Sequence, residues 1–191
     1  MINLTKGQKI DLTKDDKSAL TRINVGLGWD EVTFGRDVDC DASCVLLDEN
    51  DKVISKDYNE STVYFGNTKL PGIKHSGDNL TGGGKGDDET IELDLDAVSA
   101  KVHKIVVFMN IYKGTERGQN MSSLKNAFIR LYNPKDGNKE ICRFDLDDSK
   151  GSAGGLIVGE VYRHNGNWKF GAIGEAVKEA DVISQIVKRY F

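Results

Sequence analysis

The chain has 191 residues, a length typical of one compact domain, so residues 1–191 are predicted to form a single domain. Hydrophobic residues make up 38% and charged residues 29%, which excludes a disordered chain. The formal net charge of -4 leaves no basic surface to attract phosphate backbones, so we expect no nucleic-acid partner. With 21 Gly and only 2 Pro, the composition favours tight turns between short strands.

The N-terminus lacks a basic stretch followed by an apolar segment, and the longest apolar run covers only residues 105–109. We therefore expect neither secretion nor a membrane-spanning helix. Cys40, Cys44 and Cys142 are odd in number and lack the spacing of metal ligands, which predicts buried free thiols.

Alternation of apolar and polar residues predicts most of the secondary structure. The first strand spans residues 21–27, and residues 28–30 are predicted to end it. In the next strand, residues 37–48, the even positions from Val38 to Leu46 are small or apolar and should face the core.

Seven further segments flanked by Gly, Pro, Asn or Asp read as strands: residues 62–65, 90–95, 104–112, 127–132, 140–146, 156–163 and 168–173. Asn165-Gly166 predicts a tight hairpin turn, and only residues 175–190 show helical spacing. The predicted fold class is all-β: a β-sandwich of two antiparallel-rich sheets with a C-terminal helix packed on one of them.

The most unusual segment is residues 77–89, GDNLTGGGKGDDE. It places Asp78 before a run of small residues and Asp87, Asp88 and Glu89 after it. Calcium accepts six to eight oxygens from carboxylates, Asn side chains and backbone carbonyls, and glycines allow a backbone to turn its carbonyls inward. The segment therefore predicts a calcium site, with a solvated acidic loop as the open alternative.

A second acidic group comes from the strand at residues 37–48. Period-2 alternation places Asp37, Asp39 and Asp41 on one face about 6.6 Å apart. Their repulsion is about 2.5 kcal/mol per neighbouring pair at an effective dielectric near 20, and a divalent cation would turn it into attraction. An exposed edge strand protected by charge is the alternative. An EF-hand is excluded, because Ala42 stands where Gly is required and Asp48 where a bidentate Glu is required.

Other kinds of site lack their signatures. Gly86 follows Lys85 where a phosphate-binding loop needs Ser or Thr. His75, His103 and His164 have no metal-ligand spacing and are predicted to be surface or core histidines. The Gly-x-Ser-x-Gly motif of a serine hydrolase is missing from the sequence.

Several segments occur in a specific order and spacing: VGLGWD at residues 25–30, DCDAS at 39–43, HSGDNLTG at 75–82, GDDE at 86–89, EVYR at 160–163 and WKF at 168–170. Together they resemble the TerD family of tellurium-resistance and stress proteins. The resemblance spans nearly the whole chain.

The resemblance implies a bacterial, cytoplasmic protein with a calcium-binding β-sandwich, linked to resistance to tellurite and other chemical stresses and sometimes associated with membrane-bound partners. It also implies the cation ligands, which would be Asp39, Asp41, Asp78, Asn79, Asp87, Asp88 and Glu89, with backbone oxygens near Gly82 and Gly84 and with Asp30 and Asp37 as weaker candidates.

The leading functional hypothesis is a calcium-dependent binding or scaffold module without enzymatic activity, in which the cation orders a surface for protein partners in a stress-response complex. The alternative is a phosphoester hydrolase that holds Mg²⁺ or Mn²⁺ with the same carboxylates. A third hypothesis is direct chemistry on tellurite by the thiols of Cys40, Cys44 or Cys142.

Overall fold

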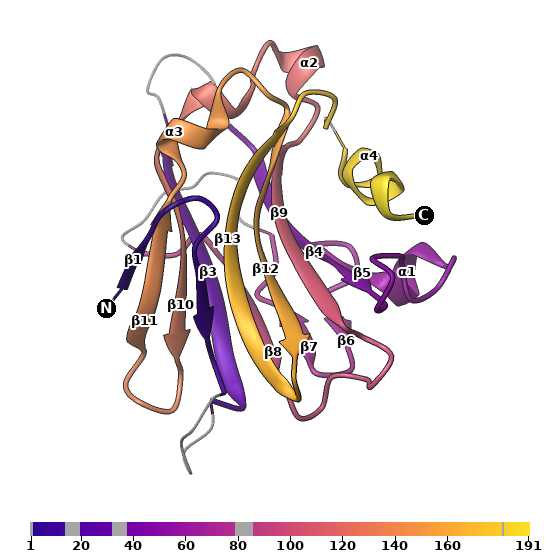
Figure 1. The fold of residues 1–191 in the computed structure, drawn as a ribbon. Coiled ribbons are helices and arrows are strands. Elements are labelled where there is room, and N and C mark those ends of the chain that lie inside the picture. Colours follow the sequence, from indigo (N-terminus) through magenta and orange to yellow (C-terminus); the bar gives the residue numbers. More distant parts are fainter. Residues whose placement is uncertain (1, 14–19, 32–37, 79–85, 181) are drawn as a thin grey trace.

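Two β-sheets pack face to face in the computed structural model, with short helices at the margins (Figure 1). The structure describes residues 2–13, 20–31, 38–78, 86–180 and 182–191. The predicted all-β sandwich is confirmed.

The seven-stranded sheet contains, in spatial order, β1 (Ile2–Leu4), β11 (Lys139–Asp145), β10 (Leu124–Asn133), β3 (Arg22–Glu31), β8 (Glu89–Asp94), β7 (Ile73–His75) and β6 (Lys69–Leu70). The six-stranded sheet contains β2 (Lys9–Asp11), β13 (Asn167–Val177), β12 (Gly155–His164), β9 (Lys104–Ile111), β4 (Cys40–Leu47) and β5 (Thr62–Val63). Among these strands, β1 and β11 pair in parallel and the other pairs are antiparallel.

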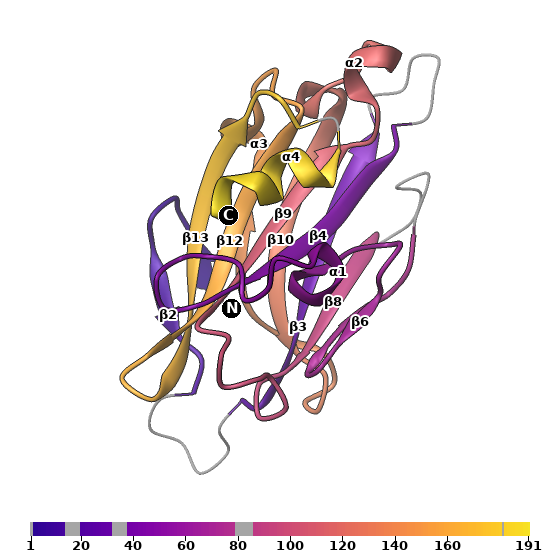
Figure 2. The same ribbon diagram turned by 90° about the vertical axis from the view of Figure 1, so that its right-hand side faces the viewer.

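The helical segments are short: α1 (Tyr58–Ser61), α2 (Gly114–Arg117), α3 (Asp147–Lys150), α4 (Ile183–Val187) and the 3₁₀ turns Met121–Ser123 and Lys188–Tyr190. The outer face of the six-stranded sheet is covered in part by α4 (Figure 2). Within the described parts of the chain, none of the helices has the length and hydrophobicity needed to cross a bilayer.

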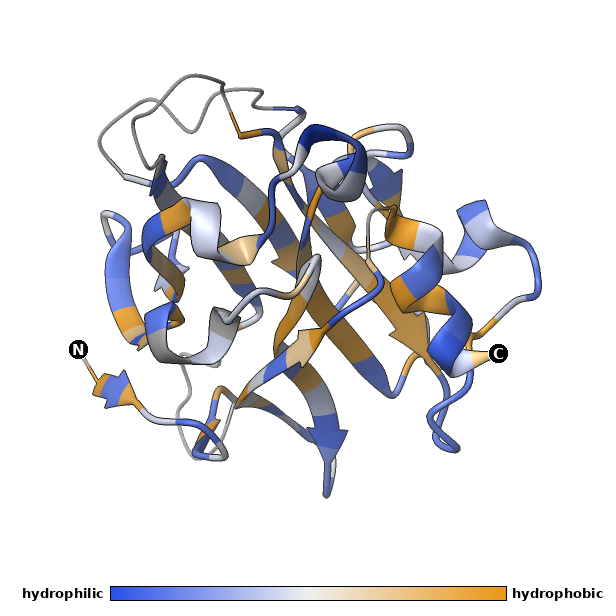
Figure 3. Ribbon diagram, turned by 90° about the horizontal axis from the view of Figure 1, so that it is seen from above, coloured by the Kyte–Doolittle hydropathy of each residue, from blue (hydrophilic) through white to orange (hydrophobic). Residues whose placement is uncertain are grey.

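The hydrophobic segments of the strands gather in the middle of the molecule when it is viewed from above (Figure 3). Strand β4 is buried on both of its faces. The predicted core positions Cys40, Ala42 and Cys44 do lie between the sheets, whereas Val45 and Leu47 point outward into an apolar cluster beneath α4. β5 pairs only with Cys44 and Val45, but every residue of β4 is buried, so the alternative of an exposed, charged edge strand does not hold for Asp41.

Two predicted boundaries are wrong. The first strand does not end at residues 28–30, because β10 continues to pair with β3 as far as Glu31. The predicted helix at residues 175–190 is only α4 and the 3₁₀ turn after it, because residues 175–177 pair with β12 and extend β13. The predicted hairpin turn is confirmed, with φ of 51° at Asn165 and 77° at Gly166.

Candidate metal centre

Three carboxylates converge where the two sheets meet at one end of the sandwich. Asp39 precedes β4, Asp41 lies in β4, and Asp78 follows β7. One carboxylate oxygen from each lies within 4.8 Å of the others. We call these three residues the acidic triad. Asp39 and Asp41 come from the six-stranded sheet and Asp78 from the seven-stranded sheet, so the triad spans the two layers.

Asp41 is the buried member of the acidic triad. Asp41 is only 3% exposed, and its Oδ2 has no hydrogen-bond partner among the described residues. Burial, reinforced by the nearby carboxylates of Glu89, Asp39 and Asp78, raises the pKa of Asp41 to about 8. A cation placed next to this carboxylate would strongly stabilise its ionised form.

Asp39 is half-buried and contacts a cation of the protein itself. Its Oδ2 lies 3.3 Å from Nη1 of Arg117, at the end of α2. Burial raises the pKa of Asp39; the guanidinium of Arg117 opposes that rise, and Asp78 adds to it. The sequence pattern did not predict the contact between Arg117 and Asp39, because the two residues are 78 positions apart and no local pattern links them.

A buried histidine holds the two sheets together beside the acidic triad. Nε2 of His75 in β7 lies 2.9 Å from the carbonyl oxygen of Ala42 in β4 and 3.3 Å from Oε2 of Glu89. The backbone N–H of Gly77 donates to Nδ1 of His75, so the ring proton is on Nε2, which donates. His75 is thus a core histidine, one of the two placements predicted for it, and its contact with Ala42 joins β7 to β4, which the sequence did not reveal.

Glu89 begins β8 and is also buried. Its Oε2 accepts the backbone N–H of Ala42 at 2.6 Å. Together with the His75 contact, this bond ties β8 and β7 to β4 immediately beside Asp41. Gly77, with φ of 107°, then turns the chain so that Asp78 reaches the same place.

Other predicted ligands lie apart from the acidic triad. Asp87 binds Arg130 with both oxygens, at 2.7 Å and 3.0 Å. Oδ2 of Asp88 accepts the backbone N–H of Trp29 at 2.8 Å, and burial raises the pKa of Asp88. Oδ2 of Asp30 accepts from the side chain of Asn126 at 2.6 Å. The predicted ligands Asn79, Gly82, Gly84 and Asp37 lie outside the described residues.

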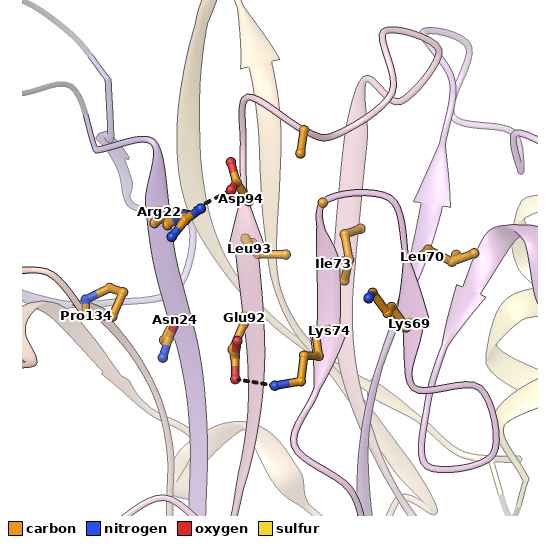
Figure 4. Close-up of a pocket in the computed structure, with 12 residues that line it drawn as sticks. Arg22, Asn24, Lys69, Leu70, Ile73, Lys74, Glu92, Leu93, Asp94 and Pro134 are labelled. Carbon is orange, nitrogen blue, oxygen red and sulfur yellow. Dashed lines mark hydrogen bonds and ion pairs between the residues drawn. The ribbon is translucent and has the colours of Figure 1, made fainter.

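A well-formed groove lies elsewhere on the protein. It has a volume of about 580 Å³ and lies on the outer face of the seven-stranded sheet, near the end of β8 remote from Glu89 (Figure 4). Its charged lining is largely paired, Arg22 with Asp94 and Lys74 with Glu92. No member of the acidic triad lines it, so it is not part of the candidate centre.

Comparison with known proteins decides the family. The TerD domain model matches residues 1–190. The chain belongs to the TerD family. Among TerD-family relatives, general stress protein 16U of Bacillus subtilis is 44% identical, with 91% of this chain and 89% of that protein covered. Tellurium resistance protein TerD of Serratia marcescens is 40% identical, with coverage of 91% and 90%.

The fold of this TerD-family chain also matches a solved structure, a homologue of the telluride resistance protein TerD from Streptomyces coelicolor. The TM-score is 0.66 at 20% identity, over 83% of this chain and 91% of that one. At that identity the likeness concerns the fold. The family is one of tellurium resistance and general stress response.

Proposed function

We propose that this TerD-family chain is a calcium-binding protein of the bacterial stress response and that the acidic triad forms the described part of its cation site. The observation that carries the proposal is the buried, unpartnered Oδ2 of Asp41. A carboxylate taken out of water is strongly destabilising unless it is paired, protonated or bound to a metal ion. Two further carboxylates within 4.8 Å make a metal ion the partner that fits.

The charge around this oxygen supports a divalent cation. When all three carboxylates of the acidic triad are ionised, as a bound cation requires, they and Arg117 together carry two net negative charges. Bringing these carboxylates together costs Coulomb energy that a doubly charged cation reverses. Calcium accommodates an irregular set of carboxylate oxygens at about 2.3–2.6 Å, whereas magnesium requires nearly octahedral geometry.

The placement of the acidic triad also supports a role as a binding or scaffold module. Asp39 and Asp41 belong to one sheet and Asp78 follows a strand of the other. A cation bound by all three would link the two sheets at one end of the sandwich, and so order the adjoining surface for a protein partner. This role requires no catalytic residue.

Calorimetric titration of chelator-stripped protein tests the proposal. We expect calcium to bind more tightly than magnesium and Asp41→Asn to weaken the binding at least tenfold. Calcium should also raise the melting temperature, since a ligand that binds only the folded state stabilises it by about 2.7 kcal/mol at a hundredfold excess over Kd. Absence of calcium binding by the unaltered chain would refute the proposal.

The hydrolase hypothesis predicts a different result. Phosphatase assays with Mg²⁺, Mn²⁺ and Ca²⁺ should give no metal-dependent turnover if the chain is a binding module. Turnover that disappears in Asp41→Asn would instead assign the acidic triad to catalysis.

Thiol chemistry on tellurite is disfavoured by the state of the cysteines. All three are free and buried, and burial raises the pKa of Cys44 and of Cys142 to about 12 and that of Cys40 well above its usual value. The thiolate is the reactive form, and it is scarce under these conditions. A folded variant with all three replaced by Ser should protect cells against tellurite as well as the unaltered chain does.

We further propose a cytoplasmic location and protein partners in a stress-response complex, some of them membrane-associated. Cell fractionation with and without a calcium chelator tests this part: the chain should be found in the soluble fraction, with a calcium-dependent portion in the membrane fraction. A chain found wholly outside the cytoplasm would contradict it.

A further inference from the structure

Asn110 is a polar residue in the most apolar strand of the protein. All residues of β9 from Ile105 to Ile111 are buried, and Asn110 is 0% exposed. Neither Oδ1 nor Nδ2 of Asn110 has a hydrogen-bond partner among the described residues. A fully buried carboxamide without partners is destabilising, and each such group in a native protein requires an explanation.

The position of Asn110 in the sheet indicates what it faces. Asn110 pairs directly with Asp41 across the antiparallel ladder of β4 and β9. Directly opposed residues share one face of the sheet, with Cβ atoms about 4.5–5.5 Å apart. The second unpartnered group, Oδ2 of Asp41, therefore adjoins the carboxamide, yet Nδ2 does not donate to it. Ser43, two residues along β4 on the same face, also has a buried hydroxyl oxygen without a partner.

On the other side of Asn110, no described group forms a hydrogen bond with the carboxamide. Its partner in β12 is Gly155, which has no side chain. A Cβ atom placed on Gly155 would lie 2.8 Å from Cβ of Ala180 and 3.0 Å from Cδ1 of Ile186. Methyl groups of the C-terminal segment thus lie on that side, beside the carbonyl oxygen of Met109. The unpartnered carboxylate oxygen of Asp41 is therefore the polar group that a shared ligand would join to Asn110.

We propose that Oδ1 of Asn110 is a further, uncharged ligand of the cation held by the acidic triad. The inference rests on the proposed function and adds a specificity-determining residue to it. A neutral oxygen raises the coordination number without adding another repelling charge. Calcium uses six to eight oxygens and accepts Asn carbonyls, whereas magnesium keeps six tightly arranged ligands and several waters. Asn110 therefore favours calcium over magnesium.

The test is calorimetric titration of calcium and of magnesium into two chelator-stripped proteins, the unaltered full chain and its Asn110→Leu variant. Leucine is similar in size to asparagine but lacks both polar side-chain atoms. Asn110→Leu should weaken calcium binding at least tenfold and magnesium binding less than threefold. Without cations, the same variant should melt at a higher temperature than the unaltered chain, because a buried polar group without partners has been removed. Asn110→Val repeats the comparison if Asn110→Leu fails to fold.

Thr62→Val is the matched control. The hydroxyl of Thr62 is also buried and unpartnered, and Thr62 pairs with Val45 on the same face of β4. It is four residues, about 13 Å, along the strand from Asp41. Thr62→Val should keep calcium affinity within twofold.

The outcomes separate the two proposals. If the unaltered chain binds neither calcium nor magnesium, the proposed function itself fails. If the unaltered chain binds calcium and Asn110→Leu binds it equally well, a buried water or an empty space adjoins Asn110, and this inference alone is overturned. Equal losses of calcium and magnesium affinity would overturn the assignment of selectivity to Asn110.

Discussion

Asp87 and Arg130 form a bidentate ion pair, with Oδ1 of Asp87 2.7 Å from Nε of Arg130 and Oδ2 3.0 Å from Nη2. The pair divides the acidic residues of the segment at 77–89 into two groups. Asp78 joins the acidic triad, whereas both oxygens of Asp87 are held by a guanidinium on β10. Asp78 and Asp87, two carboxylates of one acidic segment, thus have different partners.

This division predicts different effects of two similar substitutions. Asp78→Asn should weaken calcium binding at least tenfold, because it removes a charge from the acidic triad. Asp87→Asn should keep calcium affinity within threefold but reduce the free energy of unfolding by about 1–3 kcal/mol, because it removes the bidentate partner of Arg130 and leaves only Glu140, at 3.4 Å, as its charged partner. Calorimetry and urea unfolding of both variants measure the two effects, and a large loss of affinity in Asp87→Asn would return Asp87 to the cation site.

The ion pair of Asp87 also depends on the absence of a side chain at Gly26. A Cβ atom at Gly26 would lie 2.2 Å from Oδ2 of Asp87. Gly26→Ala should therefore destabilise the fold by about 1–3 kcal/mol through overpacking. Gly171→Ala is the matched strand control, because its Cβ atom would meet nothing nearer than 3.5 Å, and we expect a change below about 1 kcal/mol. Equal unfolding midpoints for the two variants would contradict the argument.

His75 should matter for both stability and cation binding. His75→Phe removes the donor to the carbonyl of Ala42 and to Glu89, leaving two buried acceptors poorly satisfied, which should cost about 2–4 kcal/mol of unfolding free energy. Calcium affinity should fall as well, since β7 would no longer fix Asp78 beside β4. His164→Phe, at an exposed position, should change stability by less than about 0.5 kcal/mol. Unchanged unfolding of His75→Phe in urea would exclude the positioning role.

The cation-free protein should lose stability as the pH rises from about 4 to about 8. The folded state keeps the proton of Asp41 up to its raised pKa of about 8, whereas the unfolded carboxyl releases it near 3.8. Across that window the unfolded state binds fewer protons, so the unfolding free energy falls by at most about 1.4 kcal/mol per pH unit.

Urea unfolding in the presence of a chelator at pH 5 and pH 8 measures this slope. Asp41→Asn should flatten it, because the substitution removes the titrating group. Calcium should oppose the slope in the unaltered chain, since a metal ion binds the ionised carboxylate and its affinity rises with pH. A cation-free protein that is equally stable at both pH values, with Asp41→Asn no different, would contradict the prediction.

The sequence by itself determined most of the long strands and the faces that they bury. Period-2 alternation predicted most strands, the placement of Cys40, Ala42 and Cys44 in the core and the hairpin at Asn165-Gly166, because these features depend on local backbone geometry. It also predicted that Asp39 and Asp41 share one face, and the acidic triad contains both. The helix predicted at the C-terminus was too long, because residues 175–177 pair with β12 and this pairing outweighs their local helical preference.

Only the tertiary structure decided which charges meet. The contacts of Asp39 with Arg117, of Asp87 with Arg130 and of His75 with Ala42 join residues separated by 78, 43 and 33 positions. Asn110 could be noticed in the sequence as a polar residue in an apolar run, but its pairing with Asp41 depends on the order and register of the strands. A linear pattern records which way a side chain points along its own strand, whereas its partner is fixed by the packing of strands that are distant in sequence.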